Sequence, residues 1–152
     1  MSGSPITESS AELDDLIGYN LKRVYMIFQD KLRDILGQEG LAPRSYSVLS
    51  LTVQQPSVTQ SELARRLGIE RSGLVAIVDG LESLGLLERV GVPGDRRVQA
   101  LTPTLTGREV HERTAVRIAR DEERLLSVLS GQDRRALIRI LGRLRDMHEV
   151  RG

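Results

Sequence analysis

Residues 59–84 predict two short helices joined by a tight turn, and this stretch constrains the rest of the chain. Thr59 and Glu62 have the spacing of a capping box, in which each side chain accepts a hydrogen bond from the other residue's backbone N–H. Gly68 ends the first helix because glycine adopts the left-handed conformation without steric cost. Arg71 begins a second helix, whose apolar stripe continues to Leu84. This pattern is typical of a helix-turn-helix, whose second helix enters the major groove of DNA.

A β-hairpin is predicted directly after this motif. Residues 86–90 and 97–101 have the pattern of β-strands, and a Gly-Val-Pro-Gly-Asp-Arg loop separates them. A helix-turn-helix followed by a hairpin is a winged helix, in which the hairpin forms the wing. The order of the elements therefore predicts a mainly α-helical fold with a small β-hairpin wing.

Residues at fixed spacings around these elements match the pattern of a known family. They are Leu41, Pro43, Tyr46, Val48, Leu49, residues 59–68, Arg71, Ser72, Val78, Asp79, Leu81, Glu82, residues 85–89, Asp95, Arg96, Arg97, Thr104 and Gly107. Through these residues the chain resembles the MarR family of transcription regulators from about Leu16 to the C-terminus. The most specific part of the resemblance is the wing motif and its spacing to the helix-turn-helix. The chain departs from the family pattern at Pro103, where the usual motif has leucine, so we expect the second strand to end early.

The resemblance implies one domain with long helices at both ends. We expect residues 1–10 to be disordered, because they are small and polar, and residues 11–152 to form a single MarR-like domain. Within this domain, residues 43–103 are expected to form the winged helix-turn-helix lobe. Residues 11–37 and 104–150 are expected to supply the dimerisation helices.

The first long helix is predicted to run from Leu13 to Gly37, with Ser9 and Glu12 as its capping box. At roughly 25 residues it is longer than the usual mean of about 11 to 12 residues. Its apolar stripe and that of the last helix are too long for the core of one chain. We therefore expect a homodimer held together by both ends of the chain.

Two further helices are predicted after the wing. Thr104 is the expected N-cap of a long helix that continues through Leu129. Residues 130–133 break this helix and cap the last one, whose apolar stripe runs from Leu137 to Met147.

The resemblance places DNA contacts on the helix-turn-helix and on the wing. Arg71 and Ser72 open the second helix, where they either reach base edges and phosphates or form an ordinary solvated helix start. The following positions offer few polar groups, so sequence preference is expected to depend on thymine methyl groups, on the wing and on DNA shape. The predicted DNA-binding residues are Thr59, Gln60, Ser61, Arg71, Ser72, Gly73, Val75, Ala76, Asp95, Arg96 and Arg97.

In the resembling family an Asp-x-Arg pair fixes the wing, and an arginine from it enters the minor groove of the operator. Asp95 and Arg97 match this pair, with Arg96 between them. The alternative is an ordinary charged hairpin tip. Three more arginines, which either contact phosphates or form surface ion pairs with Glu62, Glu70 or Glu88, are Arg65, Arg66 and Arg89.

A small aromatic or phenolic effector is also implied by the resemblance, in a crevice between the first two helices and the DNA-binding lobe. The candidate residues are Tyr19, Arg23, Met26 and Tyr46. An arginine and a tyrosine hold a carboxylate through charge-assisted hydrogen bonds, and a methionine covers an aromatic ring. The alternative is that these side chains pack in the core or in a subunit interface.

Composition argues against several other classes of protein. The chain has no cysteine, which excludes structural disulfides and thiolate metal sites. His111 and His148 are interpreted as helix-surface residues, and we expect no metal site, no cofactor and no enzymatic activity. The chain has no apolar run near 18 residues and no signal-peptide pattern, which favours a cytoplasmic protein without membrane contact.

The formal net charge is only +1, so any basic DNA surface depends on where the arginines lie. The sequence therefore favours a homodimeric regulator, most simply a repressor, that binds double-stranded DNA at a pseudo-palindromic operator. A winged-helix protein-interaction module without a DNA or ligand response is the alternative.

Overall fold

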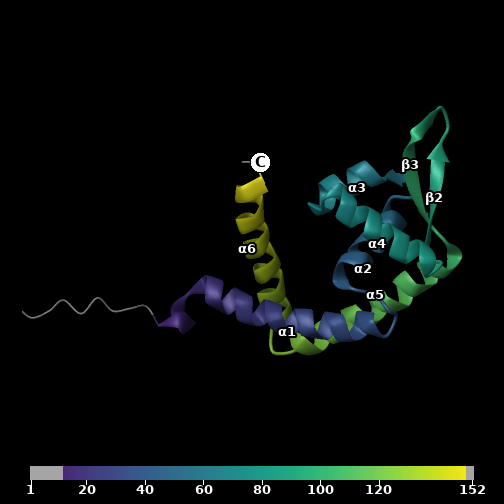
Figure 1. The fold of residues 1–152 in the computed structure, drawn as a ribbon. Coiled ribbons are helices and arrows are strands. Elements are labelled where there is room, and N and C mark those ends of the chain that lie inside the picture. Colours follow the sequence, from purple (N-terminus) through teal and green to yellow (C-terminus); the bar gives the residue numbers. More distant parts are fainter. Residues whose placement is uncertain (1–11, 150–152) are drawn as a thin grey trace, which may run out of the picture.

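The protein, seen in a computed structural model, is mainly α-helical with a small antiparallel sheet, which confirms the predicted fold class (Figure 1). The structure describes residues 12–149. In chain order, the elements are η1 (Leu13–Asp15), α1 (Ile17–Gly37), α2 (Pro43–Gln54), β1 (Val58–Thr59), α3 (Gln60–Leu67), α4 (Arg71–Ser83), β2 (Leu87–Val92), β3 (Asp95–Pro103), α5 (Leu105–Leu125) and α6 (Gly131–Glu149). Within residues 12–149, no helix has the length and apolar character that a membrane crossing needs.

Three shorter helices and the sheet form one lobe, from which the long helices extend. α2, α3 and α4 pack against one another, and α2 and α3 also contact β3. The hairpin of β2 and β3 projects from this lobe as a wing (Figure 1). α1 and α5 lie side by side and cross the base of the lobe, while α6 turns away from α5 and stands apart (Figure 1).

One hydrophobic core joins the lobe to the long helices. Leu36 of α1, Leu49 of α2 and Leu74 of α4 are fully buried in it. The other fully buried apolar side chains are Val48, Val58, Leu63, Val78, Leu81, Leu87 and Leu101. Burial of each such side chain stabilises the fold by about 1.5 to 3 kcal/mol. Because α3 and α4 both supply members of this cluster, their packing sets the angle between the two helices.

The sheet has three strands in the order β1-β3-β2, all antiparallel. The two-residue strand β1 was not predicted, because it is recognisable only by its pairing with Ala100 and Leu101. The prediction that the second wing strand ends early is wrong, since Pro103 pairs with Leu87 at the end of β3. Proline is tolerated there because the terminal position of a strand can do without a backbone donor.

The first long helix begins later than predicted. Leu16 is extended, with φ −82° and ψ 121°, and separates η1 from the 21-residue helix α1. The side-chain amide of Asn20 donates to the carbonyl oxygens of Asp14 (2.6 Å) and Leu16 (2.9 Å), which stabilises this break. The proposed cap at Ser9 and the predicted disorder of residues 1–10 lie outside the described residues.

The start of α5 is fixed by one threonine and one glycine. Thr104 caps the helix as predicted, because its hydroxyl oxygen accepts from the backbone N–H of Gly107 at 2.9 Å. The same hydroxyl donates to the carbonyl oxygen of Gly85 at 2.5 Å. Gly107 is buried against the backbone of Leu86, where a Cβ atom would overlap the carbonyl oxygen. The helix is therefore held against the turn between α4 and β2.

The break between the last two helices is also confirmed. α5 ends at Leu125, four residues before the predicted Leu129. Ser130 and Asp133 form a reciprocal capping box with N···O distances of 3.1 and 3.2 Å. α6 therefore starts in a new direction.

Candidate nucleic-acid interface

The turn between α3 and α4 has the local geometry that the sequence predicts. Thr59 is the N-cap of α3, and its hydroxyl oxygen accepts from the backbone N–H of Glu62 at 3.2 Å. Gly68 ends the helix in the left-handed conformation, with φ 62°. The backbone N–H of Ile69 then donates to the carbonyl oxygen of Ala64 at 3.0 Å, which closes the turn. α4 is thereby placed across α3 with one face exposed.

A groove of about 630 Å³ lies between the starts of α3 and α4 and strand β3. It is lined by Thr59, Gln60, Ser61, Arg71, Leu74, Val75, Arg97, Val98 and Gln99. Six of the predicted DNA-binding residues thus come together from four elements, β1, α3, α4 and β3, although they are up to 38 positions apart in the chain. Ser72, Gly73 and Ala76 lie elsewhere on α4, while Asp95 and Arg96 begin β3 at the wing.

Gln99 lines the groove but was not among the predicted DNA-binding residues, although the sequence carries a signal for it. Residues two apart on a strand point to the same side, so the choice of Arg97 also implied Gln99. The exposed side chain of Gln99 joins the groove from β3.

The two helices of the motif are linked by polar side chains at the groove. The Arg71 guanidinium donates through Nη2 to the Ser61 hydroxyl at 3.2 Å. This hydrogen bond directs the Arg71 side chain from the start of α4 toward the start of α3. Because both residues are exposed, the other donors of the guanidinium stay accessible. A guanidinium held in this way is available to a base edge or a phosphate.

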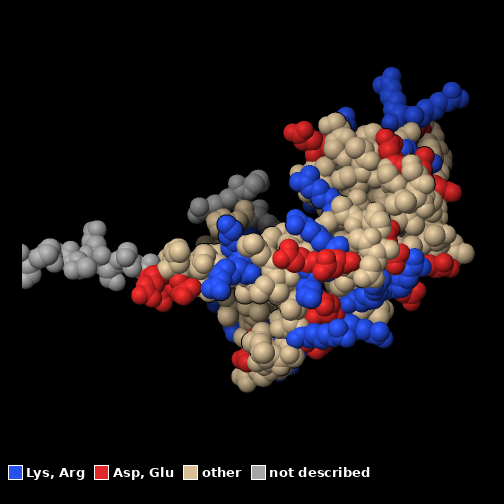
Figure 2. Space-filling view, turned by 60° about the horizontal axis from the view of Figure 1, so that its bottom comes forward, with Lys and Arg blue, Asp and Glu red and all other residues tan. Residues whose placement is uncertain are grey.

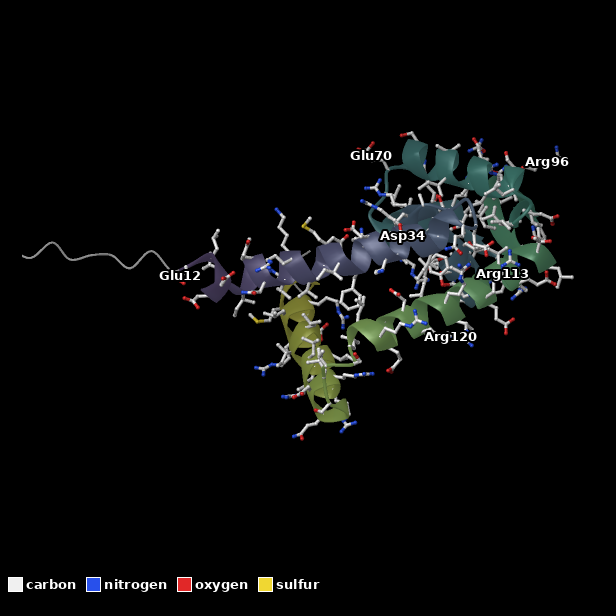
Figure 3. All side chains as sticks on the ribbon, turned by 90° about the horizontal axis from the view of Figure 1, so that it is seen from below. Glu12, Asp34, Glu70, Arg96, Arg113 and Arg120 are labelled. Atoms are coloured by element: carbon white, nitrogen blue, oxygen red, sulfur yellow. The ribbon has the colours of Figure 1, made fainter. Side chains whose placement is uncertain are left out.

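The wing is fixed by its aspartate and carries two exposed arginines. The Asp95 carboxylate accepts from the backbone N–H of Arg97 at 3.0 Å, which stabilises the turn at the start of β3. Arg96 and Arg97 are exposed, and basic side chains project from the wing end of the molecule (Figure 2). Glu70, just before α4, and Arg96 lie at opposite ends of the lobe (Figure 3). The exposed face of the lobe therefore extends from the start of α4 to the wing.

Arg89 of β2 is an internal clamp rather than a free cation. Its guanidinium contacts Asp79 at 2.6 Å, Glu82 at 3.2 Å and Gln60 at 3.1 Å, and its side chain is only 20% exposed. Of the two alternatives given for Arg89, a phosphate contact or a surface ion pair, the structure shows an ion pair, but with Asp79 and Glu82 of α4 in place of Glu62, Glu70 or Glu88. The clamp pairs with two acidic groups on α4 and joins α3, α4 and β2.

Unlike Arg89, Arg66 forms no ion pair with an acidic residue within the described part of the chain. Its Nη1 donates to the Gln55 side-chain oxygen at 2.8 Å, which connects α3 to the residue that follows α2. This contact replaces the surface ion pair that the sequence analysis offered as an alternative.

The four residues predicted to bind an effector fall into separate groups. The Arg23 guanidinium lies 5.6 Å from the centre of the Tyr19 ring, and it forms an ion pair with Asp14 at 3.3 Å. Met26, one turn further along α1, is 53% exposed. Tyr46 packs instead against the core on α2. The structure therefore brings Tyr19 and Arg23 together, but it places Tyr46 in a different environment.

His111 is not the surface residue that the sequence suggested. It is half-buried on α5, and its ring stacks on Tyr46 with a centroid distance of 5.6 Å. Burial lowers the pKa of the His111 imidazole, so the neutral form is favoured between α2 and α5. His148 is exposed on α6, as expected.

A second contact of α5 anchors it to the turn after α1. Arg113 forms a bidentate pair with Glu39 at 2.7 and 2.8 Å, and Arg117 lies 3.8 Å from the same carboxylate. Hydrogen bonding by Arg113 lowers the pKa of the Glu39 carboxyl, despite an opposing effect of burial. The long helix is thus joined to the lobe by an ion pair in addition to apolar packing.

A helix-turn-helix with an exposed second helix, next to a hairpin with exposed arginines, defines a winged-helix DNA-binding protein. The profile of the MarR family matches residues 39–98. The transcriptional regulatory protein proposed for the hcr operon of Thauera aromatica is 32% identical over an alignment of 148 residues, which covers 93% of this chain and 89% of that protein. The chain therefore belongs to the MarR family of transcription regulators, and the predicted family and non-enzymatic class are confirmed.

Solved structures agree with this assignment. The transcriptional repressor CouR bound to a 23-mer DNA duplex is 36% identical, with a TM-score of 0.81 over 89% of this chain and 96% of CouR. CouR from Rhodococcus jostii RHA1 bound to p-coumaroyl-CoA is 30% identical, with a TM-score of 0.74 over 92% of this chain and 94% of that one. The fold is thus similar to both a DNA-bound and a ligand-bound regulator.

Proposed function

We propose that this regulator is a homodimeric repressor that binds a pseudo-palindromic operator and releases it when a small aromatic effector binds. The observation on which the DNA-binding part rests is the groove, which joins Ser61, Arg71 and Arg97 from three elements. In this arrangement α4 enters the major groove and the wing reaches the adjacent minor groove.

Exposed apolar side chains on two long helices support the homodimer. On α1, Ile17 is 74% exposed and Val24 is 51% exposed. None of the side chains described on α6 is buried, and Leu137, Ile140, Leu141, Leu144 and Met147 share one face of that helix at helical spacing. Apolar faces of this extent mark a protein interface. A second copy of the chain would cover them and present two α4 helices to successive major grooves, about 34 to 36 Å apart.

Arg97→Ala is expected to weaken operator binding by about 1 to 3 kcal/mol without changing thermal stability. The reason is that Arg97 is exposed on the wing and supplies charge to the minor groove. A gel shift on the DNA directly upstream of the protein's own gene, over a range of salt concentrations, measures both the affinity and a shallower salt dependence.

Arg120→Ala is the matched control, because Arg120 is an exposed arginine on α5, away from the wing (Figure 3). It removes the same charge and should leave affinity close to wild type. Equal affinities for Arg97→Ala and the wild type at moderate salt would show that the wing does not contribute.

The effector proposal rests on the Tyr19 and Arg23 pair and on the p-coumaroyl-CoA complex of CouR. The ion pair between Arg23 and Asp14 is exposed, with 60% and 75% of the two side chains accessible. Exposed pairs of this kind contribute only about 0 to 1 kcal/mol. An anionic group of an aromatic acid, or of its thioester conjugate, is therefore able to replace Asp14 at little energetic cost. Met26 is proposed to contact the aromatic part, whereas Tyr46, which packs against the core and stacks on His111, is not assigned to this site.

Arg23→Ala is expected to abolish release of the operator by the effector while ligand-free DNA binding stays at the wild-type level. An effector that binds the DNA-incompetent dimer better by about 1 to 3 kcal/mol weakens DNA binding roughly 5- to 150-fold. Gel shifts with p-coumarate, p-coumaroyl-CoA and a panel of other aromatic acids measure this response.

Arg33→Ala is the control for loss of charge on α1, because Arg33 is an exposed arginine on the same helix. This variant should release the operator normally when the effector is added. Calorimetry on the same compounds separates binding from release. A normal response of the Arg23 variant would rule out this site, even though the assignment as a regulator would remain.

A further inference from the structure

An exposed apolar side chain lies among polar residues at the groove. Val75 of α4 is 41% exposed and lines the groove together with Ser61 and Arg71. It belongs neither to the core nor to the apolar faces of α1 and α6. In the major groove of DNA the apolar group available at a base edge is the 5-methyl group of thymine. Val75 is thus suited to contact the 5-methyl group of a thymine.

The neighbouring side chains limit what else α4 can read. Gly73 and Ala76 have no side-chain donor or acceptor. Asp79, one turn after Val75, would be able to accept from cytosine, but one of its carboxylate oxygens already accepts from the Arg89 guanidinium at 2.6 Å, which competes with a base for this group. Hydrogen-bonded readout by this part of α4 is therefore concentrated at its start.

Arg71 supplies that hydrogen-bonded contact, and its position on α4 sets how many base pairs separate its contact from that of Val75. Its Nη2 is held by Ser61 at 3.2 Å, which restrains a side chain whose other donors match the O6 and N7 acceptors of guanine. Arg71 and Val75 are four residues apart, so they share one face of the helix. Four residues rise about 6 Å along the helix, and base pairs are spaced about 3.4 Å apart. The two contacts therefore fall roughly one to two base pairs apart.

We infer that Val75 reads the methyl group of a thymine located one to two base pairs from a guanine contacted by Arg71, in each half-site of the operator. This inference rests on the proposed binding of α4 in the major groove.

The test begins with selection of duplexes from a randomised DNA library by the full-length protein. Each thymine of the strongest duplex is then replaced by deoxyuridine, which lacks only the 5-methyl group. One thymine in each half-site should show a roughly fourfold loss of affinity, the factor expected for burying about one methyl group. In Val75→Ala this thymine and uracil should bind equally well. Val116→Ala removes a similarly exposed valine on α5, 46% accessible, and should retain the wild-type discrimination.

The register is tested on the same duplex with 7-deazaguanine, which removes the N7 acceptor. One guanine, within two base pairs of the sensitive thymine, should show a loss of affinity that disappears in Arg71→Ala. Thermal unfolding of each variant confirms that the fold is retained.

Four outcomes would contradict the proposals, and each shows which proposal fails. If uracil is tolerated at every position, or if Val75→Ala still discriminates, the assignment to Val75 is overturned while DNA binding stands. If the sensitive guanine lies far from the sensitive thymine, the shared register is overturned. If the library yields no preferred sequence, the proposed function itself fails.

Discussion

Gly107→Ala is expected to destabilise the protein by about 3 kcal/mol or more, the upper range for forced overpacking of a core. The Cβ of an alanine would overlap the carbonyl oxygen of Leu86 and come within 2.8 Å of its carbonyl carbon. Neither atom is the end of a flexible side chain, so relief requires α5 to move away from the turn between α4 and β2. For a chain of this size the loss corresponds to a melting temperature roughly 6 to 12 °C lower.

Gly80→Ala is the matched control for this prediction. Gly80 lies within α4, and a Cβ there meets no atom within 4 Å. Alanine is favoured over glycine in a helix by about 1 kcal/mol, so this variant should be slightly more stable than the wild type. Both melting temperatures must be measured at the same protein concentration, because the stability of a dimer depends on concentration. A Gly107 variant as stable as the wild type would mean that α5 is not fixed to the lobe at this contact.

The double variant Leu141→Glu, Leu144→Glu is expected to be monomeric and to lose most of its operator affinity. These leucines are 41% and 48% exposed on the apolar face of α6, where a second copy of the chain is proposed to pack. A buried, unpaired glutamate opposes that packing. Joining two half-site contacts in one dimer raises the affinity by about 100- to 10,000-fold, so the monomer should bind at least about 100-fold more weakly.

Sedimentation and gel shifts together check this prediction. The expected monomer has the 16.9 kDa mass of one chain. Arg139→Gln together with Arg135→Gln is the control, because it lowers the charge by the same amount on the opposite side of the helix. A double leucine variant that remains dimeric, or a monomer that binds the operator normally, would contradict the proposed role of α6.

Local signals account for the parts of the fold that were predicted correctly. The cap at Thr59, the left-handed Gly68 and the cap at Thr104 each depend on atoms within a few residues along the chain. Such contacts form in almost any context that permits a helix. The helix-turn-helix and the start of α5 were therefore predictable from the sequence alone.

Long-range contacts explain the features that were missed. Strand β1 has only two residues and exists through its pairing with Ala100 and Leu101. Arg89 donates to Gln60, which lies 29 positions earlier in the chain. No periodic pattern in the sequence indicates which nearby carboxylates Arg89 pairs with. The half-buried state of His111 depends on Tyr46, which belongs to another helix.

The candidate DNA site shows the same division. The sequence by itself determined which residues open the second helix of the motif and which arginines belong to the wing, because turn and helix signals are short-range. Only the tertiary structure decided that Ser61 holds Arg71, that β3 places Arg97 and Gln99 at the groove beside α4, and that Arg89 pairs with Asp79. These relations depend on the angle between α3 and α4 and on the position of β3. That geometry is set by burial of side chains from separate elements in one core, which a one-dimensional pattern does not encode.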